Sequence, residues 1–283
     1  MPIAFLFVDG LGVSDDPRSP LRTTPLPTLS ELTGDFAAAA YDQPGAAYRV
    51  LDATLGVEGL PQSATGQTTL LTGMNGPQLL GRHQGPHPGS RMQALLNDES
   101  LPVWATKRGL RVLHANGYRP EYLERVIDAQ RNLMSAFAFA ARAAGQALLL
   151  STDPRAQRPG NWPDPAAAGA AFASVSDKHA LTVLEYFMLD FAGHREPSRV
   201  PQALIELDAF VAGFRRAAPA STLVICSDHG NAEESWHTQH TRNPVPFIAC
   251  GPDAHTVPAM TSIADLSGWI RSRLADAPVV TRG

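Results

Sequence analysis

The sequence contains little cysteine and little lysine, and each shortage excludes a class of protein. Its 283 residues include only 2 cysteines, Cys226 and Cys250, too few for a disulfide framework or a cysteine-rich zinc site. Both lie in apolar runs, which favours buried free thiols in a reducing compartment. Lysine occurs only at Lys107 and Lys178, no Lys/Arg-rich run is present, and the net charge is −4. The charge pattern therefore gives no reason to expect a nucleic acid or an anionic membrane as a partner.

Long hydrophobic runs are also absent. No stretch approaches the ~18 uninterrupted apolar residues of a membrane span. The first apolar run, residues 3–8, is short, has no basic leader and meets Asp9 at once, which is unlike a signal peptide. We therefore expect a cytoplasmic protein. A composition of 44% hydrophobic and 18% charged residues is typical of a folded chain. Its length allows one large domain or two modest ones of roughly 100–200 residues each.

What the sequence does contain is a regular alternation of short apolar runs and helical patterns. Such alternation is typical of α/β proteins, and it predicts a mostly parallel central sheet with helices on both faces. The predicted strands cover residues 3–8, 49–54, 111–114, 181–189, 222–226 and 245–250. The predicted helices cover residues 64–72, 101–108, 121–129, 132–144, 201–217 and 262–275.

Residues 119–175 break this rhythm. They are helical at first, then rich in proline and glycine between residues 154 and 165, and then rich in alanine. We predict a small helical cap or insertion here, over the edge of the sheet, although the alanine-rich part would equally suit a plain surface helix. Residues 1–118 and 176–283 then form the core.

Asp and His residues lie at the ends of four predicted strands. In open α/β sheets, ligands bind beyond the carboxyl ends of the strands, so chemistry is expected there. Each of these side chains, taken alone, is equally well explained as a turn residue or a solvated loop residue. That explanation would have to hold four times at sites far apart in the sequence, so metal ligation is the better account. The candidate ligands are Asp9, Asp190, His194, Asp228, His229 and His240.

These ligands sort into two sets of mixed oxygen and nitrogen donors. One set is Asp9, Asp228 and His229, and the other is Asp190, His194 and His240. Three protein ligands leave an open coordination position, which a catalytic metal needs for a substrate oxygen. We expect Asp190 and His194 to converge through a loop that turns back after the strand at 181–189.

A candidate nucleophile lies in the segment 59–73, where hydroxyl groups precede a predicted helix. A helix N-terminus offers free backbone N–H groups and the positive end of the helix dipole, and both favour a phosphate group. The hydroxyl-bearing residues there are Ser63 and Thr65. The alternative is that either residue merely caps the helix.

Three motifs resemble the alkaline phosphatase superfamily, and most of all cofactor-independent phosphoglycerate mutase, with phosphopentomutase as a more distant cousin. They are Ser-Asp-His-Gly-Asn-Ala-Glu at 227–233, His-Thr-x-Asn-Pro-Val-Pro at 240–246, and Asp190-x-x-x-His194. The resemblance covers roughly residues 1–117 and 176–283, the metal-binding catalytic core. Ser63 stands nine residues before Thr72, a spacing that resembles the nucleophile segment of the superfamily and favours Ser63 over Thr65.

The resemblance implies two divalent metal ions, Mn²⁺ in preference to Zn²⁺. It implies that Asp9, Ser63, Asp228 and His229 surround one ion and that Asp190, His194 and His240 surround the other. It also implies a small phosphorylated metabolite as substrate. Arg82, Arg91 and Arg242 are candidate phosphate or carboxylate clamps by their charge type.

The sequence departs from the mutase pattern in two respects. Mutases of this type carry a large second domain, whereas about 55 residues near 119–175 stand in its place here. They also carry His four residues after the nucleophile, where this chain has Gln67. We therefore predict phosphoryl transfer through a phosphoserine at Ser63, with hydrolysis of a small phosphomonoester favoured. The alternatives are a true phosphomutase, a phosphodiesterase, and a non-catalytic ligand-binding protein stabilised by metals.

Overall fold

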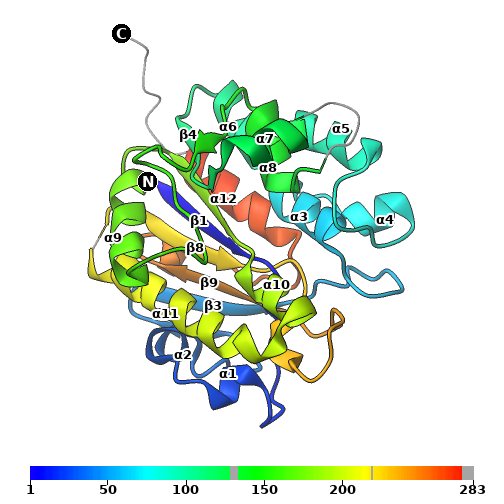
Figure 1. Cartoon of the computed structure of the whole chain (residues 1–283), viewed down its shortest axis with the longest axis vertical. Coiled ribbons are helices and arrows are strands. Elements are labelled where there is room, and N and C mark those ends of the chain that lie inside the picture. Colours follow the sequence, from blue (N-terminus) through cyan, green and yellow to red (C-terminus); the bar gives the residue numbers. More distant parts are fainter. Residues whose placement is uncertain (128–132, 218, 276–283) are drawn as a thin grey trace.

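The computed structural model describes residues 1–127, 133–217 and 219–275. Its centre is a seven-stranded sheet in the order β2-β3-β9-β8-β1-β7-β4, covered by helices on both faces (Figure 1). The strands are β1 (Ile3–Val8), β2 (Tyr41–Gln43), β3 (Ala46–Leu51), β4 (Val112–His114), β7 (Leu181–Tyr186), β8 (Thr222–Cys226) and β9 (Val245–Cys250). A separate two-stranded sheet pairs β5 (Gly117–Tyr118) with β6 (Leu149–Leu150).

The sheet is mostly but not wholly parallel, which confirms the predicted fold class. Strand β1 is parallel to β7 and β8, and β4 is parallel to β7. Strand β9 is antiparallel to both of its neighbours, β8 and β3, and β2 is antiparallel to β3. The strands at the centre read as continuous apolar runs because helices cover both of their faces.

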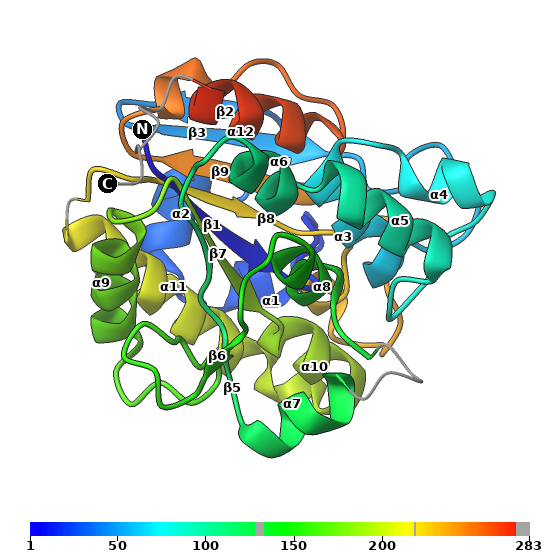
Figure 2. The same cartoon turned by 90° about the horizontal axis from the view of Figure 1, so that it is seen from above.

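Alternate residues of β1 contribute to two separate hydrophobic cores. Ala4, Leu6 and Val8 belong to the core beneath α2 (Pro27–Thr33), α9 (Pro165–Ser176) and α11 (Val200–Arg216). Ile3, Phe5 and Phe7 belong to the opposite core, beneath α3 (Ser63–Thr72), α5 (Ser90–Glu99), α6 (Leu101–Lys107), α8 (Ala136–Ala143) and α12 (Asp265–Ala275). Figure 2 shows α3, α6 and α12 on one side of the sheet and α9 and α11 on the other. This is the pleat of a strand buried on both sides.

The remaining helices are short or lie at the rim of the sheet. They are α1 (Pro20–Thr23), α4 (Gly76–Leu80), α7 (Pro120–Ile127) and α10 (Met188–Arg195). Of the predicted helices, the part at 128–129 and residue 132 lie outside the described residues. In the described chain, no helix is both long enough and apolar enough to cross a membrane.

Two predicted strands are too long at their ends: the strand predicted at 49–54 ends at Leu51, and the strand predicted at 181–189 ends at Tyr186, where helix α10 follows. The apolar pair Met188 and Leu189 resembles a continued strand in the sequence. In the structure Leu189, Ala192 and Gly193 are buried, and this spacing is that of one helix face. Asp190 and His194 therefore lie one helical turn apart rather than in a loop.

The segment 119–175 contributes to the main body of the molecule as well as to the space above the sheet edge. Phe137 on α8 stacks on Phe7 of β1 with the ring centroids 4.4 Å apart. Phe172 on α9 lies against Phe210 of α11, with the ring centroids 5.7 Å apart. The division into a core and a cap at residues 119–175 stays a prediction, with α8 and α9 packed into the two cores.

Helices α9 and α11 cross where each presents a glycine to the other. A Cβ atom at Gly213 would overlap the carbonyl oxygen of Ala166, and one at Gly169 would overlap that of Phe210. We expect Gly213→Ala to lower the free energy of unfolding by roughly 1–3 kcal/mol, because the overlap outweighs the better helix propensity of alanine. Urea denaturation measures this. The matched control is Gly268→Ala on α12, where a Cβ meets nothing within 4 Å, and which should raise stability by about 0.5–1 kcal/mol. Equal changes in the two variants would contradict the close crossing.

Candidate metal centre

The predicted ligands meet at one edge of the sheet because of strand direction. Asp9 follows β1, and Asp228 and His229 follow β8, at the carboxyl ends of two parallel strands. His240 precedes β9, but β9 runs antiparallel, so its beginning lies at the same edge. An isolated bridge between Gly230 and Thr241 joins the two loops. The topology therefore brings together residues that are more than 200 positions apart.

The first cluster contains Asp9, Asp228 and His229, whose ligand atoms all lie within 4.8 Å of one another. His229 Nε2 lies 3.3 Å from Asp9 Oδ1 and 3.6 Å from Asp228 Oδ2. Ser63 Oγ lies 3.1 Å from the same Nε2 atom. The structure thus brings Ser63 to the set of residues with which the sequence grouped it.

The second cluster contains Asp190, His194 and His240, again with all ligand atoms within 4.8 Å of one another. Asp190 and His194 share one face of α10 at i and i+4. His194 Nε2 lies 2.9 Å from His240 Nε2, and the two atoms lie 3.3 Å and 3.5 Å from Asp190 Oδ1. The rings of His229 and His240 stack with their centroids 3.7 Å apart, so the two clusters adjoin.

The hydrogen bonds around the second cluster set the state of its imidazoles. His194 Nδ1 lies 2.7 Å from the Thr238 carbonyl oxygen, and His240 Nδ1 lies 2.8 Å from that of Pro61. Each Nδ1 therefore donates a hydrogen, and each neutral ring turns its Nε2 lone pair toward the other. Two lone pairs at 2.9 Å repel unless a cation lies between them. The hydrogen bond to Asp190 is the main cause that raises the pKa of His194.

The first cluster contains carboxylate oxygens that nothing in the described chain satisfies. Asp9 Oδ1 and both side-chain oxygens of Asp228 are buried without a hydrogen-bond partner. Burial, followed by repulsion between acidic neighbours, raises the pKa of both carboxyl groups well above the usual range. Burial also lowers the pKa of His229 to about 3, so this ring is neutral. Buried carboxylates with neutral imidazoles are a donor set that fits divalent cations.

Glu233 is a structural residue of the site to which the sequence analysis gave no role, although it lies within the motif at 227–233. Its carboxylate is fully buried. It accepts hydrogen bonds from the backbone N–H groups of Gly12 and Asn231 and from the side chains of Thr241 and Asn243. One carboxylate thus ties together the loops after β1 and β8 and the loop before β9. Asn231 in turn donates to Asp190 Oδ1 at 3.1 Å.

The two candidate nucleophiles have different surroundings. Ser63 is the first residue of α3 and borders the cavity described below. Thr65 is fully buried, and its hydroxyl donates to the Gln62 carbonyl oxygen at 3.1 Å and accepts from Gln84 N at 3.2 Å. Gln67, the residue at the position of the mutase histidine, links Asp9 to the start of α8. Its Nε2 lies 3.5 Å from Asp9 Oδ2, and its Oε1 accepts from Ala136 N at 3.3 Å.

A cavity of about 660 Å³ opens beside the two clusters. Asp9, Ser63 and Asp190 border it on the metal side, and residues from β5, β7, α7 and the loop before α9 complete its wall. The arginines in that wall are Arg119 and Arg158. Sequence reasoning missed both, because they lie in the segment 119–175, which has no strand-end motif to draw attention to them.

The arginines predicted as substrate clamps lie elsewhere. Arg82, Arg91 and Arg242 are exposed, and they are not among the residues that line this cavity. Arg91 donates to the Leu79 carbonyl oxygen at 2.8 Å. Their role as clamps stays a prediction that this arrangement does not favour.

The metalloenzyme superfamily model matches residues 166–275. Similar proteins include the 2,3-bisphosphoglycerate-independent phosphoglycerate mutases of Natronomonas pharaonis and Thermomicrobium roseum, which are 32% and 34% identical over 123 residues. These matches cover 38% and 39% of this chain, and 24% and 22% of the relatives. The chain therefore matches only about a quarter of the length of these relatives.

Solved structures share the fold over almost the whole chain. The PH0037 protein from Pyrococcus horikoshii has a TM-score of 0.61 at 12% identity and covers 99% of both chains. The cold-active alkaline phosphatase from a psychrophilic Shewanella species has a TM-score of 0.57 at 12% identity, over 97% of this chain and 100% of that one. The family model and the mutase relatives agree with the resemblance of the motifs to metalloenzymes of the alkaline phosphatase superfamily, and the solved structures share the fold.

Proposed function

We propose that this chain hydrolyses a small phosphomonoester through a phosphoserine at Ser63, with two divalent metal ions, Mn²⁺ in preference to Zn²⁺. Metal-dependent phosphoryl transfer is the class of activity that the superfamily supports. The observation that carries the finer proposal is the position of Ser63. Its Oγ lies 3.1 Å from His229 Nε2, beside buried carboxylate oxygens that lack partners and at the mouth of a large cavity.

Asp9, Asp228 and His229 would hold one ion beside Ser63, and Asp190, His194 and His240 would hold the other. When bound, such ions lower the pKa of a nearby hydroxyl and neutralise charge on phosphoryl and leaving oxygens. Each protein group has its own part. Thr238 and Pro61 orient the imidazoles through their carbonyl oxygens, and Asn231 orients Asp190. These contacts pre-organise the ligands.

Ser63 begins α3, and Gln62 before it forms no side-chain cap. The first turn of a helix has N–H groups without intrahelical partners, and they favour an anionic group there. The Thr65 N–H already donates to the Gln84 carbonyl oxygen at 3.1 Å. A phosphoryl group at this position would accept hydrogen bonds from the N–H groups of Ser63 and Ala64, and Ser63 Oγ would attack phosphorus in line with the leaving oxygen. Water would then hydrolyse the phosphoserine.

The experiment starts from chelated protein reloaded with Mn²⁺ or Zn²⁺. We expect p-nitrophenyl phosphate to be turned over at least about 10-fold faster than bis(p-nitrophenyl) phosphate, because a monoester presents three free phosphoryl oxygens to two cations and the helix N–H groups, whereas a diester presents two. A reversed preference would make the protein a phosphodiesterase. Absence of turnover with either metal and either ester would contradict the catalytic proposal and favour a metal-stabilised binding protein.

A phosphomutase is the second candidate, favoured by the mutase relatives. It is tested by adding 3-phosphoglycerate to the metal-loaded protein and measuring 2-phosphoglycerate. The proposed hydrolase releases inorganic phosphate from phosphomonoesters. Formation of 2-phosphoglycerate without free phosphate would establish the mutase instead.

A further inference from the structure

The cavity wall contains a buried carboxyl group that neither metal cluster uses. Glu185 lies on β7, is 7% exposed and lines the same cavity as Ser63 and Asp9. It pairs in register with Phe7, two residues before Asp9, so the side chains of Glu185 and Asp9 lie on the same side of the sheet. Sequence reasoning missed it because it lies inside an apolar run.

Short contacts connect Glu185 to the metal side of the cavity. Ser135 Oγ donates to Glu185 Oε1 at 2.9 Å. The next residue, Ala136, donates its N–H to Gln67, and Gln67 in turn contacts Asp9. Ser135 and Gln67 thus connect the Glu185 carboxyl group to the predicted metal ligand Asp9, and Glu185 itself contacts none of the predicted ligands.

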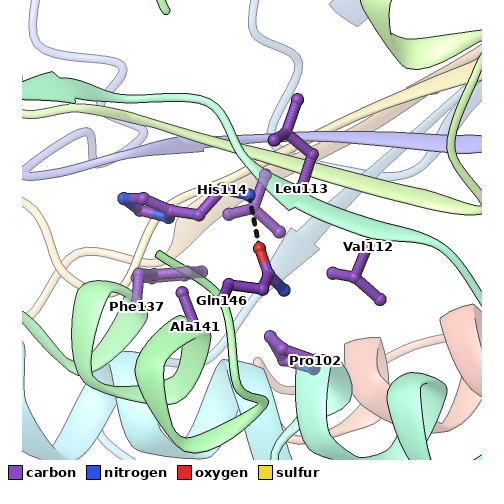
Figure 3. A pocket seen from close by; sticks show the side chains of 8 residues that line it. Pro102, Val112, Leu113, His114, Phe137, Ala141 and Gln146 are labelled. Carbon is purple, nitrogen blue, oxygen red and sulfur yellow. Dashed lines mark hydrogen bonds between the residues drawn. The ribbon is translucent and has the colours of Figure 1, made fainter. Parts of the chain in front are cut away.

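Glu185 has no cation in contact with it among the described residues. His114 Nε2 lies 3.5 Å from Glu185 Oε1, but burial lowers the pKa of His114 to about 3, so this ring is neutral. His114 Nε2 lies 2.8 Å from Tyr118 Oη, and the two rings stack with their centroids 5.9 Å apart. Gln146 Oε1 accepts a hydrogen bond from the His114 backbone N–H at 2.9 Å, drawn as the dashed line in Figure 3. Among the described residues, the side chains that contact the Glu185 carboxyl group are therefore the uncharged Ser135, Tyr118 and His114.

Such surroundings keep a carboxyl group protonated near neutrality. Burial raises the pKa of Glu185 to about 7, although hydrogen bonds from Ser135 and Tyr118 partly oppose this. The titratable and charged groups that face Glu185 or share its cavity are Asp9, Asp190, His87, His114, Tyr118, Tyr122, Arg119 and Arg158.

We propose that Glu185 donates the proton that the leaving oxygen takes up when the phosphoryl group moves to Ser63, an inference that rests on the proposed function. Arg119 and Arg158 line the same cavity as Ser63 and Glu185. They would bind an anionic or strongly polar leaving group and direct its ester oxygen past Glu185.

The proton balance is complete in both steps. In the first, the bond from Ser63 Oγ to phosphorus forms, the bond from phosphorus to the leaving oxygen breaks, and the Ser63 hydroxyl proton goes to solvent. Glu185 gives its proton to the leaving oxygen, which departs as an alcohol, and becomes a carboxylate. In the second step, water attacks phosphorus and gives a proton to Glu185. Ser63 Oγ departs and regains a proton from solvent. The products are an alcohol and inorganic phosphate.

The test compares two leaving groups in metal-loaded Glu185→Gln. An alkyl ester such as glycerol 2-phosphate leaves as a strongly basic alkoxide and needs an acid, whereas p-nitrophenolate is stable near neutral pH. We expect kcat/KM to fall by about 10²–10⁴-fold for the alkyl ester and by less than about 10-fold for the nitrophenyl ester. The parent should lose alkyl-ester activity as the pH rises through the pKa of Glu185, and the variant should lack this limb. Glu121→Gln, an exposed change on α7, is the matched control.

The outcomes separate this inference from the proposed function. Turnover of the nitrophenyl ester by the parent establishes the phosphatase activity independently of Glu185. Given that turnover, an equal loss for both esters with an unchanged pH limb would overturn the proton-donor role and leave Glu185 as a positioning residue. No loss for either ester would overturn it as well. Thermal unfolding and metal content of the variant, compared with the parent, identify a simple folding or metal-loading defect.

Discussion

Replacing Ser63 by alanine should abolish turnover of a phosphomonoester, with kcat falling by on the order of 10³–10⁶-fold. The reason is that Ser63 Oγ is the hydroxyl that borders the cavity beside His229 Nε2. Removing one oxygen leaves Asp9, Asp228 and His229 in place, so metal content should stay close to that of the parent. The variant should also fail to form the phosphoprotein that acid quenching of the parent, followed by peptide mapping, would trap at residue 63.

Two further variants define the effect of Ser63→Ala. Ser90→Ala is the matched control, because Ser90 is also the first residue of a helix, α5, but is exposed and outside the site. It should keep full activity. Thr65→Val tests the alternative nucleophile: it removes a buried hydrogen-bonding hydroxyl and should lower stability while keeping turnover. If Thr65→Val were inactive and Ser63→Ala active, the nucleophile would be Thr65.

Replacing Asp228 by asparagine should have opposite effects on the metal-free and the metal-loaded protein. Without metal, the carboxylate is fully buried and lies close to Asp9 and Asp190, and burial and this repulsion outweigh the hydrogen bonding from Gln67 and the Gly10 backbone. A neutral amide removes that repulsion, so the free energy of unfolding should rise by roughly 1–3 kcal/mol at neutral pH. With metal in excess, the parent should gain about 4 kcal/mol at a concentration 1,000 times the Kd, and the variant should gain much less.

The pH dependence of the metal-free protein gives the sign of this effect. The folded-state pKa of Asp9 and of Asp228 is raised, so the folded chain binds more protons than the unfolded chain. Their stabilising contribution to the free energy of unfolding is therefore fully present below the usual carboxyl pKa of ~4. It is lost as the pH rises through their raised folded-state pKa values. Asp228→Asn should reduce the fall in the free energy of unfolding as the pH rises. Urea denaturation across this pH range, with and without Mn²⁺, measures both effects.

Asp98→Asn is the control for this experiment, since Asp98 is exposed on α5. It should leave both the metal-dependent gain and the pH dependence unchanged. If Asp228→Asn bound Mn²⁺ as tightly as the parent and lost stability without metal, Asp228 would be a structural residue rather than a ligand.

The sequence predicted most of the sheet because its central strands are buried on both sides and appear as uninterrupted apolar runs. Strands β1, β8 and β9 end where the pattern ends. The error at 181–189 comes from the same pattern. Met188 and Leu189 continue the apolar run of β7 in the sequence, but they belong to the first turn of helix α10. Periodicity over so short a run does not distinguish the two.

The candidate ligands could be predicted because each of them follows or precedes a buried strand, where an unpaired Asp or His is costly. Residues 227–233 and 240–246 also carry a dense motif. Glu185, Arg119 and Arg158 have no such signal. Glu185 lies within an apolar run, and the two arginines resemble ordinary surface residues until the chain folds over the cavity.

By itself, then, the sequence determined the α/β class and predicted the candidate ligands, since these depend on burial patterns and residue types that are local in the chain. The assignment of the candidate ligands to two ions came mainly from the family resemblance. Only the tertiary structure decided how the ligands are oriented. It turned Asp190 and His194 onto one helix face, opposed the Nε2 atoms of His194 and His240, and left Asp228 without a partner. It also decided which arginines line the cavity. The physical reason is that direction, distance and desolvation arise between segments far apart in sequence, through the antiparallel β9 and through the residues of α7 and of the loop before α9 that line the cavity.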